Sequence, residues 1–162
     1  MKNRIKYKVL RIPVILGAII FMAVSCNQTS PIPTEPLTYK SGTLAIGSHV
    51  VNVEIADTEA LRNHGLSGRD SLAADHGMIF IFPTPDKYAF WMKDMSFSLD
   101  FIWIKDGKVS EITPDVPIQA NAADRDLNTY LPVNPIDSML EVNAGWAQTH
   151  DIKVGDAVVD HF

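Results

Sequence analysis

One polar stretch of the chain combines side chains that could bind a ligand or carry out acid–base chemistry. It runs from Trp91 to Asp94 and holds an indole, the ammonium of Lys93 and a carboxylate, and a second carboxylate, Asp100, follows six residues later. Two carboxyl groups facing one cleft can divide general acid and general base work when their surroundings separate their pKa values. Asp94 and Asp100 are therefore the candidate catalytic pair, although residues 96–98 can turn the chain between them.

Asp100 also has a structural interpretation. It lies between Leu99 and Phe101, in an apolar run of strand length. A carboxylate on the inward face of such a strand needs a partner, because an unpaired buried charge is very costly. The expected partner is a cation, and the chain offers Arg62, Arg69 or Lys93.

The aromatic residues around this stretch have two interpretations. Residues 77–105 contain eight of the fourteen aromatic side chains of the chain. Trp91 and Trp103, with Tyr88 and Phe90, could form a platform on which sugar rings or apolar ligands stack. The alternative is that these rings fill the core of a small domain. Trp91 is expected to be partly exposed, because Lys93 and Asp94 follow it directly.

Metal and nucleophile chemistry find little support in the residue pattern. His64 and His76, with Asp75 or Asp94, could ligate a metal, but no His-x-His, His-x-x-x-His or cysteine cluster accompanies them. We therefore expect no metal and no cofactor. No Gly-x-Ser-x-Gly motif occurs, and the chain has a single cysteine.

The N-terminus is typical of an exported protein. Five basic residues precede an apolar run at 12–24, which is short for a membrane span and long enough for a signal peptide. Small residues, Ala23 and Ser25, precede Cys26, as in a bacterial lipoprotein signal whose cysteine is lipidated. The prediction is a lipoprotein signal peptide at 1–25, a proline-rich tether at 26–36 and a single domain at 37–162.

Charge and lipid together define the expected partners and location. After cleavage, nine Lys and Arg remain against nineteen Asp and Glu, a formal charge of −10. Such a surface repels phosphate backbones, so nucleic acid is not an expected partner. The expected contact with a bacterial membrane is the lipid on Cys26, on the side facing the periplasm or the cell exterior. The neutral Asn27 favours the outer membrane.

Turn signals and apolar periodicity predict the elements that position these residues. A hairpin is expected from 43–46 and 49–56, then a helix at 59–64 between a cap at Asp57 or Thr58 and Gly65. Further strands are expected at 78–82, 88–92, 99–104, 108–112, 138–142 and 152–159, with a loop at 113–137 and a helix at 144–150. This pattern predicts a β-rich α+β fold: a small, strongly bent antiparallel or mixed sheet or barrel with two short helices.

Several separated motifs resemble one protein family over nearly the whole predicted domain. They are Arg-x-x-Gly-Leu at 62–66, Arg-x-x-Leu at 69–72, Gly77-Met78, Phe90-Trp91-Met92-Lys93, Leu99-Asp100, Leu140-Glu141, Gly145 and residues 152–156. The chain is similar to the domain-of-unknown-function 192 family, as a lipoprotein member. It departs from the family pattern in having Ser67, Asp94 and Ser98, and in having no cysteine within the domain. The resemblance implies a compact β-rich fold and implies no reaction.

Three functional hypotheses follow. The first is a non-enzymatic, lipid-anchored envelope domain that binds a cell-wall glycan or another envelope protein at a rim formed by Arg62, Arg69, Trp91, Lys93 and Asp94. The second is a hydrolase that acts on envelope polymers through Asp94 and Asp100. The third is a purely structural envelope component.

Overall fold

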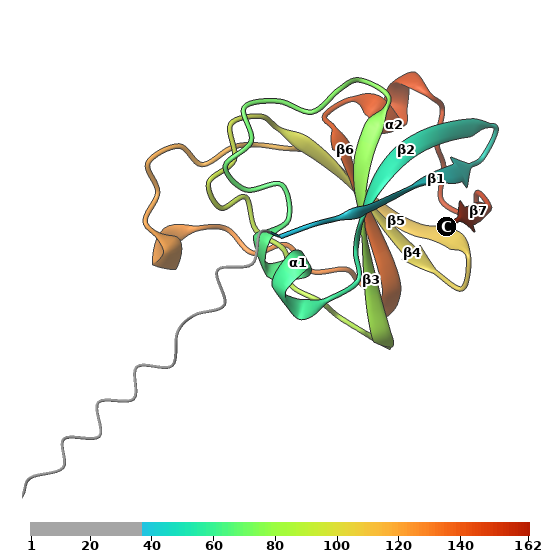
Figure 1. Cartoon of the computed structure of the whole chain (residues 1–162), viewed down its shortest axis with the longest axis horizontal. Coiled ribbons are helices and arrows are strands. Elements are labelled where there is room, and N and C mark those ends of the chain that lie inside the picture. Colours follow the sequence, from blue (N-terminus) through green and yellow to red (C-terminus); the bar gives the residue numbers. More distant parts are fainter. Residues whose placement is uncertain (1–36) are drawn as a thin grey trace, which may run out of the picture. The chain divides into compact units, whose positions relative to one another are not determined.

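The computed structural model describes residues 37–162, which are coloured in Figure 1. The predicted signal peptide at 1–25, the lipidation site Cys26 and the tether at 26–36 lie outside the described residues. Between residues 37 and 162, no helix is long and apolar enough to cross a membrane.

Seven strands of the described part form one sheet, in the order β5-β4-β6-β3-β2-β1-β7. Neighbouring strands are antiparallel, except for β2 and β3, which are parallel. The bounds are β1 Lys40–Ile46, β2 His49–Ala56, β3 His76–Asp86, β4 Leu99–Lys105, β5 Lys108–Val116, β6 Ile136–Asn143 and β7 Val158–His161. Helix α1 (Glu59–His64) lies in the β2–β3 connection, a 3-10 turn η1 (Asp124–Asp126) precedes β6, and helix α2 (Trp146–Thr149) follows it.

The two ends of the sheet approach each other on one side. The backbone N–H of Val109 donates to the carbonyl of Asp156 at 3.0 Å, and that of Val158 donates to the carbonyl of Gly107 at 2.8 Å. These bonds join the start of β5 to the start of β7, so the sheet curls into a half-barrel (Figure 1). The predicted fold class, a β-rich and strongly bent mixed sheet with two short helices, is confirmed.

Turn chemistry sets both predicted hairpins. Gly47, with φ 57°, turns β1 into β2, and Asp106 and Gly107, with φ 50° and 68°, turn β4 into β5. Two successive residues with positive φ match the right-handed twist of the flanking strands, which is why Asp-Gly is favoured there. Adjacent residues decide this geometry, so the sequence predicts it well.

Helix α1 forms where its end signals place it. The hydroxyl of Thr58 accepts the N–H of Leu61 at 3.3 Å, and Gly65, with φ 55°, follows the last helical residue. The hydroxyl satisfies one of the N–H groups that a helix start leaves unpaired, and glycine adopts the positive φ without steric cost. The helix predicted at 59–64 is confirmed.

The predicted strand at 88–92 is wrong. Only one isolated antiparallel bridge, between Phe90 and Tyr130, occurs there. Phe90 and Met92 are nevertheless buried, because the segment packs against a face of the sheet instead of joining its edge. The apolar alternation at 88–92 therefore reports burial and not strand pairing.

Three other boundaries differ from the prediction. Strand β3 continues through Pro83 and Pro85 to Asp86, because its pairing with β6 shifts register after Ile81 and requires no proline N–H. The loop expected at 113–137 is shorter at both ends, since β5 runs to Val116 and β6 begins at Ile136. Most of the strand expected at 152–159 is loop and turn; Ala157 forms an isolated bridge with Lys108, and the regular strand begins only at Val158.

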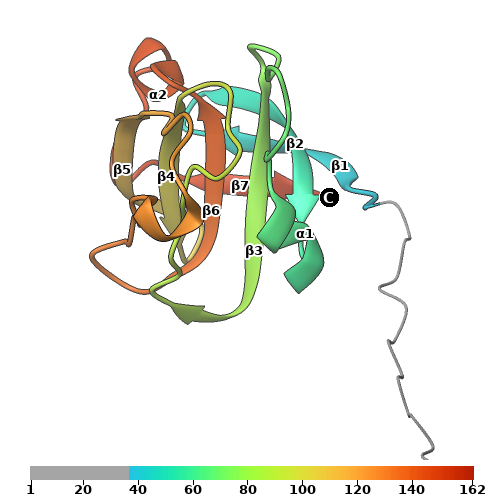
Figure 2. The same cartoon turned by 90° about the vertical axis from the view of Figure 1, so that its left-hand side faces the viewer.

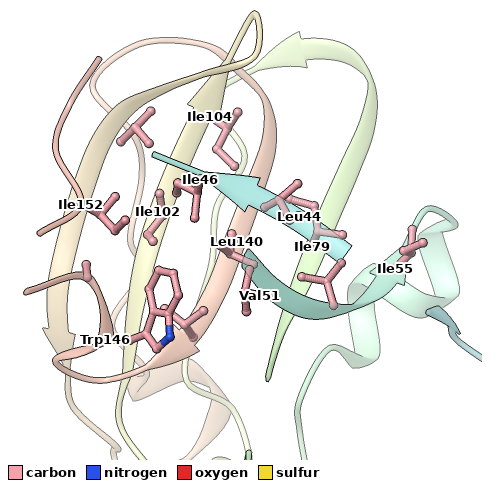
Figure 3. Close-up of a cluster of buried hydrophobic side chains, with 14 residues drawn as sticks. Leu44, Ile46, Val51, Ile55, Ile79, Ile102, Ile104, Leu140, Trp146 and Ile152 are labelled. Atoms are coloured by element: carbon pink, nitrogen blue, oxygen red, sulfur yellow. The ribbon is translucent and has the colours of Figure 1, made fainter. Parts of the chain in front are cut away.

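The concave face of the sheet carries one apolar cluster, called here the concave cluster. Side chains from the strands and α2 converge on it (Figure 3), and its buried members are Leu44, Ile46, Val51, Val53, Ile55, Ile79, Ile102, Ile104, Val109, Leu140, Val142, Trp146, Ala147 and Ile152. The curl of the sheet itself encloses these side chains. Burial of this many aliphatic residues supplies the main hydrophobic stabilisation on that side.

A second cluster, the outer cluster, lies on the opposite face of β3, β4 and β6. Its buried members are Ala56, Leu61, Leu66, Met78, Phe80, Phe90, Met92, Leu99, Phe101, Trp103, Val116, Ile136 and Met139. No second sheet is available to cover it within residues 37–162. Helix α1 and the long connections after α1, β3 and β5 cover it instead, and in Figure 2 they lie in front of the strands.

Candidate functional site

A cleft of about 650 Å³ opens between α1 and the segment that follows β3, above the outer face of the sheet. Its aromatic lining comes from Phe80, Phe82, Tyr88, Phe90 and Trp91. Its polar lining includes Glu59, Arg62, Asn63, His64, Ser67 and Glu141. A volume of this size is in the range of small-molecule sites, and so is the combination of many rings with few polar groups.

Arg62 fastens α1 to the sheet at one side of the cleft. Its Nη1 donates to the carbonyl of Asp57 and to the carbonyl of Ile81, both at 2.8 Å. Its guanidinium carbon lies 5.4 Å from the ring centroid of Phe82. The predicted rim residue Arg62 thus lines the cleft, while one of its nitrogens is committed to holding the walls in place.

Arg69 lies behind the cleft lining and is paired. Its guanidinium makes a two-point contact with Glu54, at 2.5 and 2.8 Å, and lies 5.6 Å from the ring of Tyr39. The hydrogen bonds from Arg69 hold the pKa of Glu54 below its usual value, and Glu54 raises the pKa of Arg69. Burial raises the pKa of Tyr39, whose hydroxyl donates to the carbonyls of Leu61 and Gly65. Arg69 is therefore not among the groups that face the cleft.

The segment from Trp91 to Asp94 forms the opposite rim. Trp91 is 50% exposed and lines the cleft, which confirms the expectation that this ring reaches solvent. The ammonium of Lys93 pairs with Asp124 and lies 6.0 Å from the Trp91 ring. The Lys93 pKa is raised, chiefly by its bond to Asp124.

Two backbone contacts anchor this rim. The Ser67 hydroxyl donates to the carbonyl of Lys93, and the N–H of Gly68 donates to the carbonyl of Asp94, both at 2.9 Å. Asp94 itself is exposed and has φ 54°, the left-handed conformation that Asp tolerates better than most residues. Of the five predicted rim residues, the structure brings Arg62 and Trp91 into the cleft wall and places Lys93 and Asp94 beside it.

The second predicted ring, Trp103, is not available to a ligand. It is fully buried in the outer cluster, and its Nε1 donates to the hydroxyl of Thr113 at 2.8 Å. A platform made of both tryptophans is therefore excluded. Trp91 is the indole that an incoming molecule can contact.

Asp100 is buried, but its partners are backbone amides and not the expected cation. Its carboxylate accepts the N–H groups of Asp115 at 2.9 Å, Gly145 at 3.1 Å and Ala147 at 2.9 Å. Two of these amides belong to the start of α2, where backbone N–H groups have no partner within the helix. The expectation of an Arg or Lys partner is wrong, because helix α2 and the β5 strand supply enough donors.

The Asp94 and Asp100 carboxylates serve different parts of the molecule. Asp100 holds α2, which packs in the concave cluster, whereas Asp94 lies in the segment that covers the outer cluster. Asp100 is also shut off from solvent. This geometry gives no support to a division of acid and base work between them.

Glu141 is a cleft residue that the sequence analysis missed as a site. It lies in β6 between Met78 of β3 and Phe101 of β4, on the face of the outer cluster, and it is only 4% exposed. Among residues 37–162 its carboxyl has no hydrogen-bond partner. Glu141 is one of the residues that line the cleft.

The surroundings of Glu141 favour its neutral form. Burial raises the pKa of Glu141 to about 8, and the nearby charge of Arg69 only partly opposes this effect. A carboxyl placed in a strand of otherwise apolar residues was the signal in the sequence. A buried carboxylate needs a partner, and this requirement holds for Glu141 as it does for Asp100.

The histidines do not form a metal centre with the other candidate ligands. His64 lines the cleft, whereas His76 is exposed and bonds its neighbour Asp75 at 2.8 Å. Within residues 37–162, no group of three or more His, Cys, Asp or Glu side chains is arranged to hold a metal ion.

Comparisons with known proteins show that this fold recurs. Residues 42–159 match the family model DUF192, described as "Uncharacterized ACR". A solved protein of unknown function from Novosphingobium aromaticivorans DSM 12444 is 31% identical, with a TM-score of 0.66 over 79% of this chain and 89% of that one. A protein from Sinorhizobium meliloti 1021, described as a "putative transcription regulator", is 26% identical, with a TM-score of 0.70 over 78% and 98%. No curated protein matches the chain.

The contacts of Asp100 predict a large loss of stability on replacement by Asn. Asn keeps the size of the side chain but offers one oxygen to three N–H donors and brings its own N–H₂ group against them. We expect Asp100→Asn to lower the free energy of unfolding by about 2–4 kcal/mol in urea titration. The control is Asp115→Asn, which changes an exposed side chain. Equal stabilities of the two variants would contradict this structural role.

The Glu141 carboxyl predicts a pH dependence of stability. Its folded-state pKa, about 8, is above the ordinary value of 4.5, so the native state holds a proton that the unfolded state releases between these two values. The stabilisation is present below pH 4.5 and is lost as pH rises to about 8. The difference in the free energy of unfolding is on the order of 5 kcal/mol.

Replacing Glu141 with Gln removes this titration and keeps the shape. The unfolding free energy of Glu141→Gln, measured by urea titration from pH 5 to 8, should gain on that of the unmodified protein as pH rises. Taking the difference between the two proteins cancels the contributions of the other carboxyls. A difference that stays constant over this range would show that Glu141 is not held neutral. Glu59→Gln, at the exposed rim of the cleft, is the matched control.

Proposed function

The chain belongs to the DUF192 family, and we propose that it is a lipid-anchored cell-envelope protein whose domain binds a ligand in the cleft between α1 and Trp91. The observation that carries the proposal is the Glu141 carboxyl, which is buried, lines the cleft and has no hydrogen-bond partner among the described residues. A buried polar group without a hydrogen-bond partner lowers the free energy of unfolding by about 1–3 kcal/mol. A bound molecule that supplies the missing donor recovers that free energy.

The alternatives account for less of the geometry. A hydrolase that uses Asp94 and Asp100 would need Asp100 at the cleft, and Asp100 is fully bonded to backbone amides elsewhere. A purely structural role gives no reason for a cleft of about 650 Å³ with a polar group buried in its wall. Binding without catalysis uses both features.

One structural relative is described as a "putative transcription regulator". Direct contact with DNA is disfavoured here by charge. The chain after residue 26 carries a formal charge of −10, and affinity for DNA depends on neutralising phosphates with Lys and Arg. A ligand small enough for the cleft, a cell-wall fragment among them, or a segment of an envelope protein is the partner we propose.

A ligand screen tests the binding function. The purified protein is heated with single compounds from a panel of glycan fragments, muropeptides, amines and carboxylic acids, and the melting midpoint is recorded. At least one compound should raise the midpoint in a saturable way, because a ligand of the native state stabilises it by mass action. The variant Ala89→Trp, which places an indole in the cleft wall, should abolish the shift.

The matched control for this screen is Ala120→Trp. Ala120 is exposed like Ala89 but does not line the cleft. A shift that survives Ala89→Trp would place the binding site elsewhere. A panel without any saturable shift would count against a small-molecule function for the cleft.

Replacement of Cys26 tests the lipid anchor. The Cys26→Ser variant should leave the membrane fraction and keep the mass of the unprocessed chain, because serine cannot accept the thioether-linked lipid. Thr29→Ser is the control and should fractionate like the unmodified protein. An unchanged membrane fraction and processed mass for Cys26→Ser would disprove the anchor.

A further inference from the structure

We propose that the ligand of the cleft carries a cationic nitrogen, such as a primary amine or the side chain of a basic residue, which binds the Glu141 carboxyl between the aromatic walls. This inference rests on the binding function proposed above and adds the chemical class of the ligand. It follows from three properties of the described residues: the isolation of Glu141, the behaviour of the rings and the balance of charge.

The first property is that the protein offers Glu141 no donor. Its neighbours across the sheet are Met78 and Phe101, which have no strong hydrogen-bond donors in their side chains. An ammonium or guanidinium donates charge-assisted hydrogen bonds, which are about twice as strong as neutral ones. A cationic nitrogen is therefore the group that gains most from reaching this carboxyl.

The second property is that the rings of the cleft already accept cations. The guanidinium of Arg62 lies 5.4 Å from the Phe82 ring, and the ammonium of Lys93 lies 6.0 Å from the Trp91 ring. The negative face of an aromatic ring attracts a cation at such distances. Phe80, Tyr88 and Phe90 supply further ring surface in the same lining.

The third property is the balance of the fixed charges near Glu141. Arg69 acts on it electrostatically, but both terminal nitrogens of Arg69 are bonded to Glu54. Arg62 and Glu59 line the cleft with opposite charges. Tyr39 is a neutral phenol near Glu141. His64 also lines the cleft and is exposed. A cation that replaces the proton of Glu141 keeps the charge of this site unchanged, whereas an anion would add an uncompensated charge.

This exchange predicts a proton released on binding. An alkylammonium stays charged well above pH 8, so the protonation of Glu141 alone controls the affinity. Burial raises the Glu141 pKa to about 8. As the pH increases toward that value, the affinity for the cation should rise roughly tenfold for each pH unit, and above it the affinity should stay constant.

The test compares two probes of the same shape. Nα-acetyl-lysine methylamide carries the ammonium, and the Nα-acetyl methylamide of 2-aminoheptanoic acid has a methyl group in its place. Binding to the purified full protein is followed by the change in tryptophan fluorescence up to about 10 mM, a range that detects millimolar affinity. At pH 8 the lysine probe should bind at least about tenfold more tightly than the uncharged probe. This preference for the lysine probe should fade by pH 6. Calorimetry in buffers of different ionisation enthalpy should count close to one released proton at pH 7.

Glu141→Gln keeps the shape and removes the charge. It should bind the lysine probe at least about tenfold more weakly and lose the pH dependence. Asp160→Asn, which removes a charge from an exposed side chain outside the cleft, should change the affinity less than about twofold. Equal affinity for the two probes, no binding of the lysine probe, or an unaltered pH profile in Glu141→Gln would overturn the inference. If Glu141→Gln fails to fold, the probe preference and the proton count of the unmodified protein decide the question.

The outcomes separate this inference from the proposed function. In one outcome, a neutral or acidic compound of the screen stabilises the protein, Ala89→Trp abolishes this effect, and the lysine probe does not bind. The cleft is then a binding site, and the inference that its ligand is a cation is wrong. If no compound and no probe responds to Ala89→Trp, the binding function fails and the inference fails with it.

Discussion

The apolar outer face of β3, β4 and β6 is the constraint on which the rest of the structure depends. The curl of the sheet encloses the concave cluster, but the outer cluster has only one six-residue helix and several connections to cover it. Irregular segments can cover a sheet stably only when their backbone groups are bonded. The bonds from Ser67 and Gly68 to residues 93 and 94, and the bridge between Phe90 and Tyr130, meet that requirement. The cleft lies where this cover is incomplete.

Two buried carboxyl groups in adjacent strands show opposite solutions to the same problem. Asp100 of β4 receives three backbone N–H groups and holds α2 and β5 in place. Glu141 of β6 is adjacent in the ladder but points to the other face, where it receives none. A carboxylate bonded on every side is a structural element. A carboxyl that lines a cleft and has no partner among the described residues is a candidate group for binding a ligand.

Sequence and structure agree where neighbouring residues decide the conformation. The Asp106-Gly107 turn, the helix cap and the Gly65 stop each act over four residues or fewer. The turn and the stop are confirmed, and of the two predicted caps, Asp57 or Thr58, the structure selects Thr58. The strand predicted at residues 88–92 does not form, and the reason is that apolar alternation is the same for a paired strand and for a covering segment. Of the residues that line the cleft, Arg62 and Trp91 were predicted and Glu141 was not, because a lone carboxyl in an apolar strand does not reveal which face it occupies.

The sequence by itself determined the β-rich class, the main hairpins, the helix at 59–64 and the exposure of Trp91, since short-range sterics and local polarity decide these. Only the tertiary structure decided which buried carboxyl is satisfied. Alternation along β4 and β6 turns Asp100 toward the amides of α2 and Glu141 toward the cleft, and those surroundings come from segments distant in sequence. Hydrogen-bond partners and desolvation depend on such long-range packing, which residue type and spacing do not encode.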